Sequence, residues 1–313
     1  MAAVAFALAA ACCTTSRAPF RARPALPLDE RLASRYAVPG GVVQRDWIRD
    51  GDEVSFTLIA GGESARCHAW IPDGEIRPFV LLVPILAGGD ALMRAIAKNM
   101  LERGFAACYC ERAGPALRPP QRGEDLEALF QRTVIQQRMV LEWARSSDCV
   151  RGEDSFLLGV SLGGMVSSVV AALEPGLSGT AICLSGGDLP DLVVHSHERR
   201  VIAWRDFRRA TDGLGDSCVR EELAARLESD PARLAPFVET RTVLLVEAAF
   251  DDVVPAWNRA VLWEALGRPR RFTVPAGHYT AALLLNPILD AVAEFFSARL
   301  LVGREAARGA ASP

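Results

Sequence analysis

Short, continuous apolar runs alternate with segments of helical spacing along most of this chain. The run PFVLLVPIL, residues 78–86, carries no charge, which is typical of a strand covered on both faces. Helical spacing follows in DALMRAIAKNMLERG, residues 90–104, and ends at Gly104, a suitable C-cap. The same alternation of strand-like runs and helical segments repeats toward the C-terminus. It predicts an α/β protein with a mostly parallel sheet that is flanked by helices.

Two regions depart from this alternation. Between residues 42 and 71, three short runs are separated by Gly and Asp-Gly, which predicts antiparallel strands at one edge of the sheet. Between the predicted strands near Ala181 and Val243, about sixty residues carry helical patterns, far more than an ordinary crossover needs. We expect a helical cap there, at about 187–238, over the sheet edge where sites form.

The first 27 residues have the composition of a targeting segment. An apolar stretch of about ten residues ends at Cys12-Cys13, and the chain then becomes rich in Pro and Arg. This stretch is too short to span a bilayer and fits a secretory signal. Alanines directly before a cysteine resemble a bacterial lipoprotein signal, so we expect an exported cell-envelope protein that is tethered to the membrane through Cys12. The alternative is a frayed N-terminus of a cytoplasmic protein. Residues 28–313 would form the folded domain.

The composition excludes several classes of function. With 313 residues, of which 50% are hydrophobic, the chain can bury the core of one large α/β domain. A net charge of −3 without a basic stripe argues against a nucleic-acid partner. The cysteines outside the leader show no paired C-x-x-C spacing, so we expect buried free thiols and no zinc site.

A Gly-x-Ser-x-Gly core, residues 159–163, separates two apolar runs in FLLGVSLGGMVSSVV. The first run is typical of a buried strand and the second of a helix. Glycines two residues before and after Ser161 relieve crowding in a tight turn, which favours an exposed, nucleophilic hydroxyl. Ser185, in CLSGGD, also follows a strand but has Cys183 in place of the first glycine. We therefore expect Ser185 near the pocket rim without a catalytic role.

Acyl transfer by a serine also needs a base for the hydroxyl proton and an acid that orients the base. VLLVEAAFDDVVP supplies Asp251 and Asp252 where an apolar strand ends, and TVPAGHYTAALLL supplies His278 in the loop after another strand. Alone, the carboxylates could cap a helix and the histidine could be a surface residue. Their order after Ser161, each at a strand end, favours a catalytic triad.

On GVSLGG, FDDVVP and GHYTAAL, the chain resembles an α/β-hydrolase of the serine esterase kind. The resemblance extends as a pattern over most of residues 42–302. It implies a Ser161 nucleophile, a His278 base and an Asp251 acid, which the family places four residues before the proline. It also implies a small-molecule ester as substrate, with no cofactor and no metal.

The same resemblance implies an oxyanion hole made of two backbone N–H groups. One belongs to Leu162, directly after the nucleophile, and the other to Leu86, in the loop that follows the run 78–86. The common His-Gly of this loop is replaced here by Pro84-Ile85.

Several alternatives stay open at this point. Thioesterases, lactonases, peptidases and acyltransferases use the same triad, and a non-catalytic hydrolase-like binding protein or a membrane-tethered interaction protein would also fit parts of the pattern. His195 and His197, in HSH, have no ligand partner at a suitable spacing, so we expect a structural role in the cap.

Overall fold

The structure, a computed structural model, describes residues 13–16, 23–86, 88, 90–112 and 114–310. Within these residues the centre is a ten-stranded sheet in the order β1-β10-β9-β8-β7-β5-β6-β4-β3-β2. From β10 across to β6, every neighbouring pair is parallel. The strands β4, β3 and β2 continue the sheet in antiparallel order. The predicted fold class, including the antiparallel edge, is confirmed.

The strands follow the apolar runs of the sequence. Nearly every residue is buried in β5 (Pro78–Val83), β6 (Ala106–Cys110), β8 (Gly179–Cys183) and β9 (Val243–Ala248), as expected for strands covered on both faces. The other strands are β2 (Val43–Asp50), β3 (Glu53–Ala60), β4 (Glu63–Trp70), β7 (Arg151–Val160) and β10 (Arg270–Val274).

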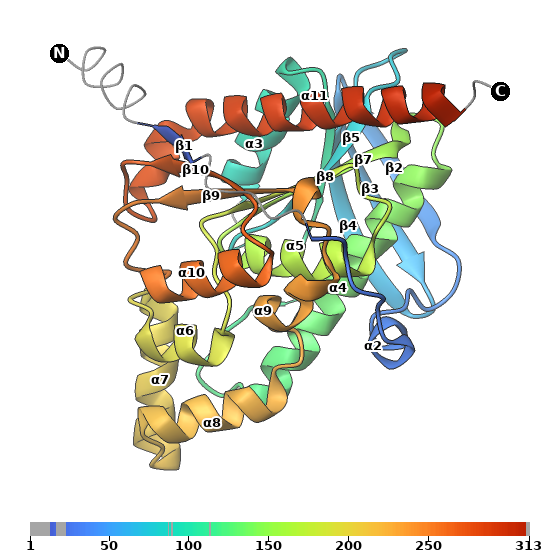
Figure 1. Cartoon of the computed structure of the whole chain (residues 1–313). Coiled ribbons are helices and arrows are strands. Elements are labelled where there is room, and N and C mark those ends of the chain that lie inside the picture. The colour runs from blue at the N-terminus through green and yellow to red at the C-terminus, as the bar shows by residue number, and fades with distance from the viewer. Residues whose placement is uncertain (1–12, 17–22, 87, 89, 113, 311–313) are drawn as a thin grey trace.

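Helices cover both faces of this sheet (Figure 1). On one face, α3 (Asp90–Glu102) and α11 (Leu285–Ala310) pack into one apolar core. On the other face, α4 (Gly123–Ser146), α5 (Leu162–Leu173) and α10 (Ala256–Ala265) pack into a second core. The segment Thr280–Gly303 is also long and apolar enough to cross a membrane, but its inner face is buried in the first core.

A further group of helices, here called the cap, joins β8 to β9 and stands beside the sheet (Figure 1). It consists of α6 (Leu189–His195), α7 (Arg199–Asp212), α8 (Asp216–Arg226) and α9 (Pro231–Leu234), within the region expected from the sequence. The apolar pattern that runs through residues 191–210 is split into two helices. The break lies at Ser196, whose hydroxyl donates to the carbonyl of Val253 at 2.6 Å.

The N-terminal segment packs against the domain where it is described. The strand β1 (Thr14–Ser16) pairs antiparallel with β10, and after it the Arg23 guanidinium donates to the carbonyl of Ala265 at 2.7 Å. A short helix, α2 (Glu30–Arg35), follows before the first of the antiparallel strands. From the sequence we expected the leader to lie apart from the fold. The strand β1 was not foreseen because it joins the sheet through backbone hydrogen bonds, which leave no apolar pattern in the sequence. Cys12 lies outside the described residues, so the membrane tether stays a prediction.

Candidate active site

Ser161 stands in a sharp turn between β7 and α5. Its backbone has φ 56° and ψ −120°, a conformation that L residues rarely adopt and that marks stored strain. A Cβ at Gly159 would lie 2.2 Å from the Gly163 carbonyl oxygen, and one at Gly163 would lie 2.0 Å from the oxygen of Val83. Both glycines are therefore required by backbone contacts, as the Gly-x-Ser-x-Gly pattern indicated.

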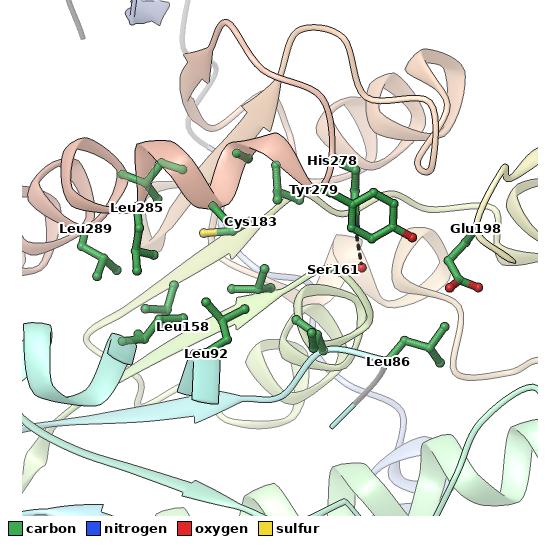
Figure 2. A pocket seen from close by; sticks show the side chains of 17 residues that line it. Leu86, Leu92, Leu158, Ser161, Cys183, Glu198, His278, Tyr279, Leu285 and Leu289 are labelled. Carbon is green, nitrogen blue, oxygen red and sulfur yellow. Dashed lines mark hydrogen bonds between the residues drawn. The ribbon is translucent and has the colours of Figure 1, made fainter. Parts of the chain in front are cut away.

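Ser161, His278 and Asp251 form a continuous chain of hydrogen bonds. The His278 Nε2 lies 3.0 Å from the Ser161 Oγ, and its Nδ1 lies 2.8 Å from the Asp251 Oδ2. An ionised carboxylate only accepts, so the proton of this second bond belongs to the imidazole Nδ1. The Nε2 is then left to accept from the serine hydroxyl (Figure 2).

The turn after β9 distinguishes the two adjacent carboxylates. The Asp251 side chain is fully buried, and its Oδ1 accepts from the N–H groups of Val253 and Val254 at 2.9 and 2.8 Å. These bonds fix the carboxylate while its Oδ2 faces His278. The Asp252 side chain is 70% exposed and lies 4.0 Å from the Nδ1 of His197. Of the two carboxylates, Asp251 therefore contacts His278 and Asp252 faces solvent.

Two backbone N–H groups close to Ser161 are free to bind an anion. Leu162 is the first residue of α5, so its N–H has no partner inside the helix. Leu86 lies three residues beyond the end of β5 and lines the space in front of Ser161. Within the described chain, no group accepts a hydrogen bond from either N–H. Leu162 follows Ser161 directly and Leu86 lines the same cavity as Ser161, and the role of their N–H groups as oxyanion donors stays a prediction.

An apolar cavity of about 180 Å³ opens on one side of Ser161. We call it the sheet-side cavity, because its walls come from strand ends and from α3 and α11, including Leu92, Leu158, Leu285 and Leu289 (Figure 2). Cys183, at the end of β8, also lines it, and burial raises the pKa of this thiol to about 12.

A second apolar cavity, of about 70 Å³, is also lined by Ser161. We call it the cap-side cavity, because the cap covers it. Its lining includes Leu192 and Val201 from cap helices and Leu129 and Phe130 from α4. Ser161, Leu86 and Glu198 line both cavities, so the two spaces meet at the serine.

Glu198 is a site residue that the sequence analysis did not single out. It is the N-cap of α7, and its Oε2 accepts from the N–H groups of Arg200 and Val201. The available signal was an acidic residue directly before a helical segment, which is typical of a cap and not specific for a binding site. Tyr279, the neighbour of His278, was likewise missed and lines the sheet-side cavity.

The remaining candidates lie away from the serine. Ser185 is buried against Gly164 of α5 and does not line either cavity, which corrects the expected rim position. His195 and His197 contact different carboxylates, those of Asp191 and Asp252. Within the residues described, no three metal-ligating side chains cluster.

Comparison with known sequences finds matches to less than half of the chain. No family model matches the chain. A stretch of 144 residues, 45% of this chain, is 32% identical to an uncharacterized protein of Mycobacterium tuberculosis, named Rv2627c in strain H37Rv and MT2702 in strain CDC 1551. The match spans about a third, 32%, of the length of these curated relatives.

Solved structures match over much more of the chain. Acetyl xylan esterase 1 from Thermoanaerobacterium superposes with a TM-score of 0.60 at 15% identity, covering 86% of this chain and 96% of its own. Est1E from Butyrivibrio proteoclasticus gives 0.58 at 17% identity, with 79% and 99% covered. A putative dienelactone hydrolase from Klebsiella pneumoniae gives 0.53 at 15% identity, with 75% and 94% covered. At such identities the likeness concerns the fold.

Proposed function

Because the chain has the α/β-hydrolase fold, we propose that it is a serine hydrolase that cleaves carboxylic esters through an acyl-enzyme. The observation that carries this proposal is the hydrogen-bonded chain from Ser161 through His278 to the buried Asp251, at the turn after β7. The neighbours that are named esterases support the choice of ester over other acyl compounds.

The proposed reaction begins when the His278 Nε2 takes the proton of Ser161 as its Oγ attacks the ester carbonyl. Asp251 holds the imidazole in the required tautomer and stabilises the imidazolium that forms. The carbonyl oxygen becomes an oxyanion between the N–H groups of Leu162 and Leu86, each of which would be worth about 10²–10³ in rate. His278 then gives its proton to the departing alcohol, and water hydrolyses the acyl-enzyme by the same steps.

A fluorophosphonate probe tests this proposal directly. We expect one equivalent of probe to label the pure protein at Ser161 and to abolish hydrolysis of p-nitrophenyl acetate. The variant Ser161→Ala should stay folded by circular dichroism, take up no probe and lose about 10⁴–10⁶-fold in kcat. Ser185→Ala is the matched control, since this serine also lies beside glycines, and it should be labelled as the wild type is. A Ser161→Ala protein that keeps a tenth of the wild-type kcat would exclude the mechanism.

A further inference from the structure

The two cavities that meet at Ser161 indicate which kind of ester fits this site. An ester carbonyl in reach of the Ser161 Oγ extends in two directions, along its acyl chain and along its alcohol. The sheet-side and cap-side cavities take their walls from different elements and share only Ser161, Leu86 and Glu198. Each cavity can therefore hold one arm of the substrate.

The walls of both cavities are almost entirely hydrocarbon. Apart from Ser161 and His278, the sheet-side lining offers only Glu198, Cys183 and the phenol of Tyr279 as polar groups. Hydroxyl groups of a sugar would lose water there without gaining partners, which costs free energy for each group. The Glu198 carboxylate at the junction would also repel a negatively charged arm.

We propose, on the premise of the function above, that the substrate is an uncharged ester with an apolar group on each side of the scissile bond. The longer arm lies in the sheet-side cavity, since its volume of about 180 Å³ exceeds the 70 Å³ of the cap-side cavity. This substrate class differs from the acetylated polysaccharide that the name of one structural neighbour, an acetyl xylan esterase, indicates for that protein.

Measurements of kcat/KM on a matched set of esters test the proposal. The set comprises ethyl acetate, ethyl hexanoate, hexyl acetate and hexyl hexanoate, with monoethyl succinate as a charged ester and acetylated xylose as a sugar ester. Each buried methylene is worth roughly fourfold in kcat/KM. We expect lengthening of either arm to raise kcat/KM at least about tenfold, and the charged and sugar esters to stay at or below the level of ethyl acetate.

Two tryptophan variants assign the arms to the cavities. Leu92 is half-buried in α3 and lines only the sheet-side cavity, whereas Leu129 is half-buried in α4 and lines the cap-side cavity. Lengthening one arm of the ester raises kcat/KM by a factor that we call the gain from that arm. We expect Leu92→Trp to reduce the gain from one long arm about tenfold and Leu129→Trp to reduce the gain from the other. Each gain is a ratio of two esters on one variant, so a loss of folded protein cancels.

The outcomes separate this proposal from the proposed function. If Ser161 is labelled and activated esters are cleaved, but only one arm or neither brings a gain, the two-armed substrate is wrong and the hydrolase stands. The same holds if acetylated xylose is the best substrate, or if both tryptophans affect one series. If the probe does not label Ser161, the hydrolase itself is wrong.

A different observation concerns the loop after β5, which holds the expected oxyanion donor Leu86. Within the described chain every peptide bond is trans, so the Ile85 carbonyl and the Leu86 N–H point in opposite directions. The Ile85 oxygen accepts from the Arg112 Nη1 and from the Gly88 N–H, both at 3.0 Å. These bonds therefore direct the Leu86 N–H away from Arg112.

Arg112 follows β6 and does not line either cavity at Ser161. It lines a separate polar cavity of about 860 Å³, together with Asp90 and Tyr109. Burial and the charge of Arg200 lower the pKa of Arg112, and no carboxylate of the described chain forms an ion pair with it. Its guanidinium donates to carbonyl oxygens of Gly114 and Ile85 instead.

We infer that Arg112 is a positioning residue, which fixes the Ile85–Leu86 peptide so that the Leu86 N–H faces the oxyanion. A guanidinium thereby supports the loop in which Pro84-Ile85 stand in place of the more common His-Gly. The cap adds a second support, because the Arg200 Nη1 of α7 donates to the Leu86 carbonyl at 3.2 Å.

The test compares Arg112→Gln and Arg112→Lys with Arg118→Gln, an exposed arginine that lines the same polar cavity. Arg112→Gln should lower kcat by about 10–10²-fold with KM within twofold, which is less than the loss of a whole oxyanion donor because the Gly88 bond remains. Arg112→Lys should recover part of kcat. Arg118→Gln should behave as the wild type.

A boronic acid, which mimics the tetrahedral intermediate, separates positioning from general damage. Its affinity should fall in parallel with kcat across the Arg112 variants, because both depend on the same N–H. An Arg112→Gln protein with kcat within twofold of the wild type would overturn the inference. So would a fall in kcat that matches the unfolded fraction, or one that leaves the affinity for the boronic acid unchanged.

Discussion

The strand ends that carry Ser161, His278 and Asp251 and the cap that covers them are held by different forces. The three side chains follow strands whose neighbours are fixed by backbone pairing on both sides. The positions of these three residues are therefore set mainly by the paired strands that precede them. This region determines which bond can be attacked, and it leaves the shape of the substrate open.

The cap is held by side chains instead. Arg208 is almost completely buried and forms ion pairs with Asp212 and Glu222, while its guanidinium lies over the ring of Trp204. Asp230 joins the two ends of the cap, because its carboxylate accepts from the N–H of Leu189 at 2.6 Å. Such contacts depend on particular residues, so a substitution here changes the walls of the cap-side cavity without touching the triad.

If the proposed substrate is correct, its two arms are selected by two different parts of the chain. The sheet-side cavity belongs to the same rigid core as the strands, whereas the cap-side cavity can be reshaped together with the cap. Substitutions at the strand ends should therefore have larger effects on catalysis than substitutions in the cap.

The acid after β9 gives the largest effect. Asp251→Asn keeps the shape of the side chain but can favour the wrong imidazole tautomer, so kcat should fall by about 10⁴-fold. Asp252→Asn, one residue later and exposed, should change kcat by no more than about threefold, since surface substitutions have small effects. Both values are measured on one ester at neutral pH. A dead Asp252→Asn beside an active Asp251→Asn would assign the acid to Asp252.

A buried arginine tests the cap. Arg208→Met removes the buried guanidinium that pairs with Asp212 and Glu222, and loss of one member of a buried ion pair costs about 3–5 kcal/mol. We expect the low end of this range, because Asp212 also pairs with Arg122 at 2.9 Å. The free energy of unfolding should fall accordingly, measured by urea denaturation. Activity on ethyl acetate should fall less than activity on an ester with two long arms.

Arg209→Met is the matched control, one position along the same helix. Arg209 is about half exposed and pairs with Asp206 and Asp216, and such surface pairs contribute about 0–1 kcal/mol. If Arg209→Met destabilised the protein as much as Arg208→Met, the cap would owe its stability to surface charge and the contrast drawn above would be wrong.

The sequence predicted the strand ends well, for a physical reason. The turn at Ser161 is so tight that only glycine fits at positions 159 and 163. The Gly-x-Ser-x-Gly pattern is therefore local and can be recognised in the sequence. Asp251 and His278 were singled out because each follows a predicted strand, in the order expected after Ser161. The helix α10 was missed because Asn258, on its buried face, is polar, and its amide donates to the carbonyl of Gly187 at 3.1 Å.

The features that sequence reasoning could not reach all depend on contacts between distant segments. The two cavities take their walls from residues between Ile85 and Leu289, on many different elements, and nothing in Leu92 or Leu285 alone marks a binding wall. The bond from Arg112 to Ile85 joins two loops after different strands. Ser185 has the same local pattern whether it faces a pocket or, as here, the buried side of α5.

The smallest effect concerns two thiols that lie in the two regions compared here. Cys183 lines the sheet-side cavity, whereas Cys218 is exposed on the cap helix α8. The thiolate is the reactive form of cysteine. Burial raises the pKa of the Cys183 thiol to about 12, so this thiol stays almost entirely protonated at pH 8, whereas Cys218 is exposed to solvent.

Iodoacetamide at pH 8 should therefore alkylate Cys218 and leave Cys183 and the esterase activity unchanged. Peptide mass mapping of both cysteines, combined with kcat on one ester, measures the outcome. Cys218→Ser is the control that removes the expected label on the cap while Cys183 stays protected. Rapid alkylation of Cys183 with loss of activity would show that the sheet-side cavity opens to water far more than its apolar walls indicate. In that case the sheet side, and not the cap, would be the adaptable part of the site.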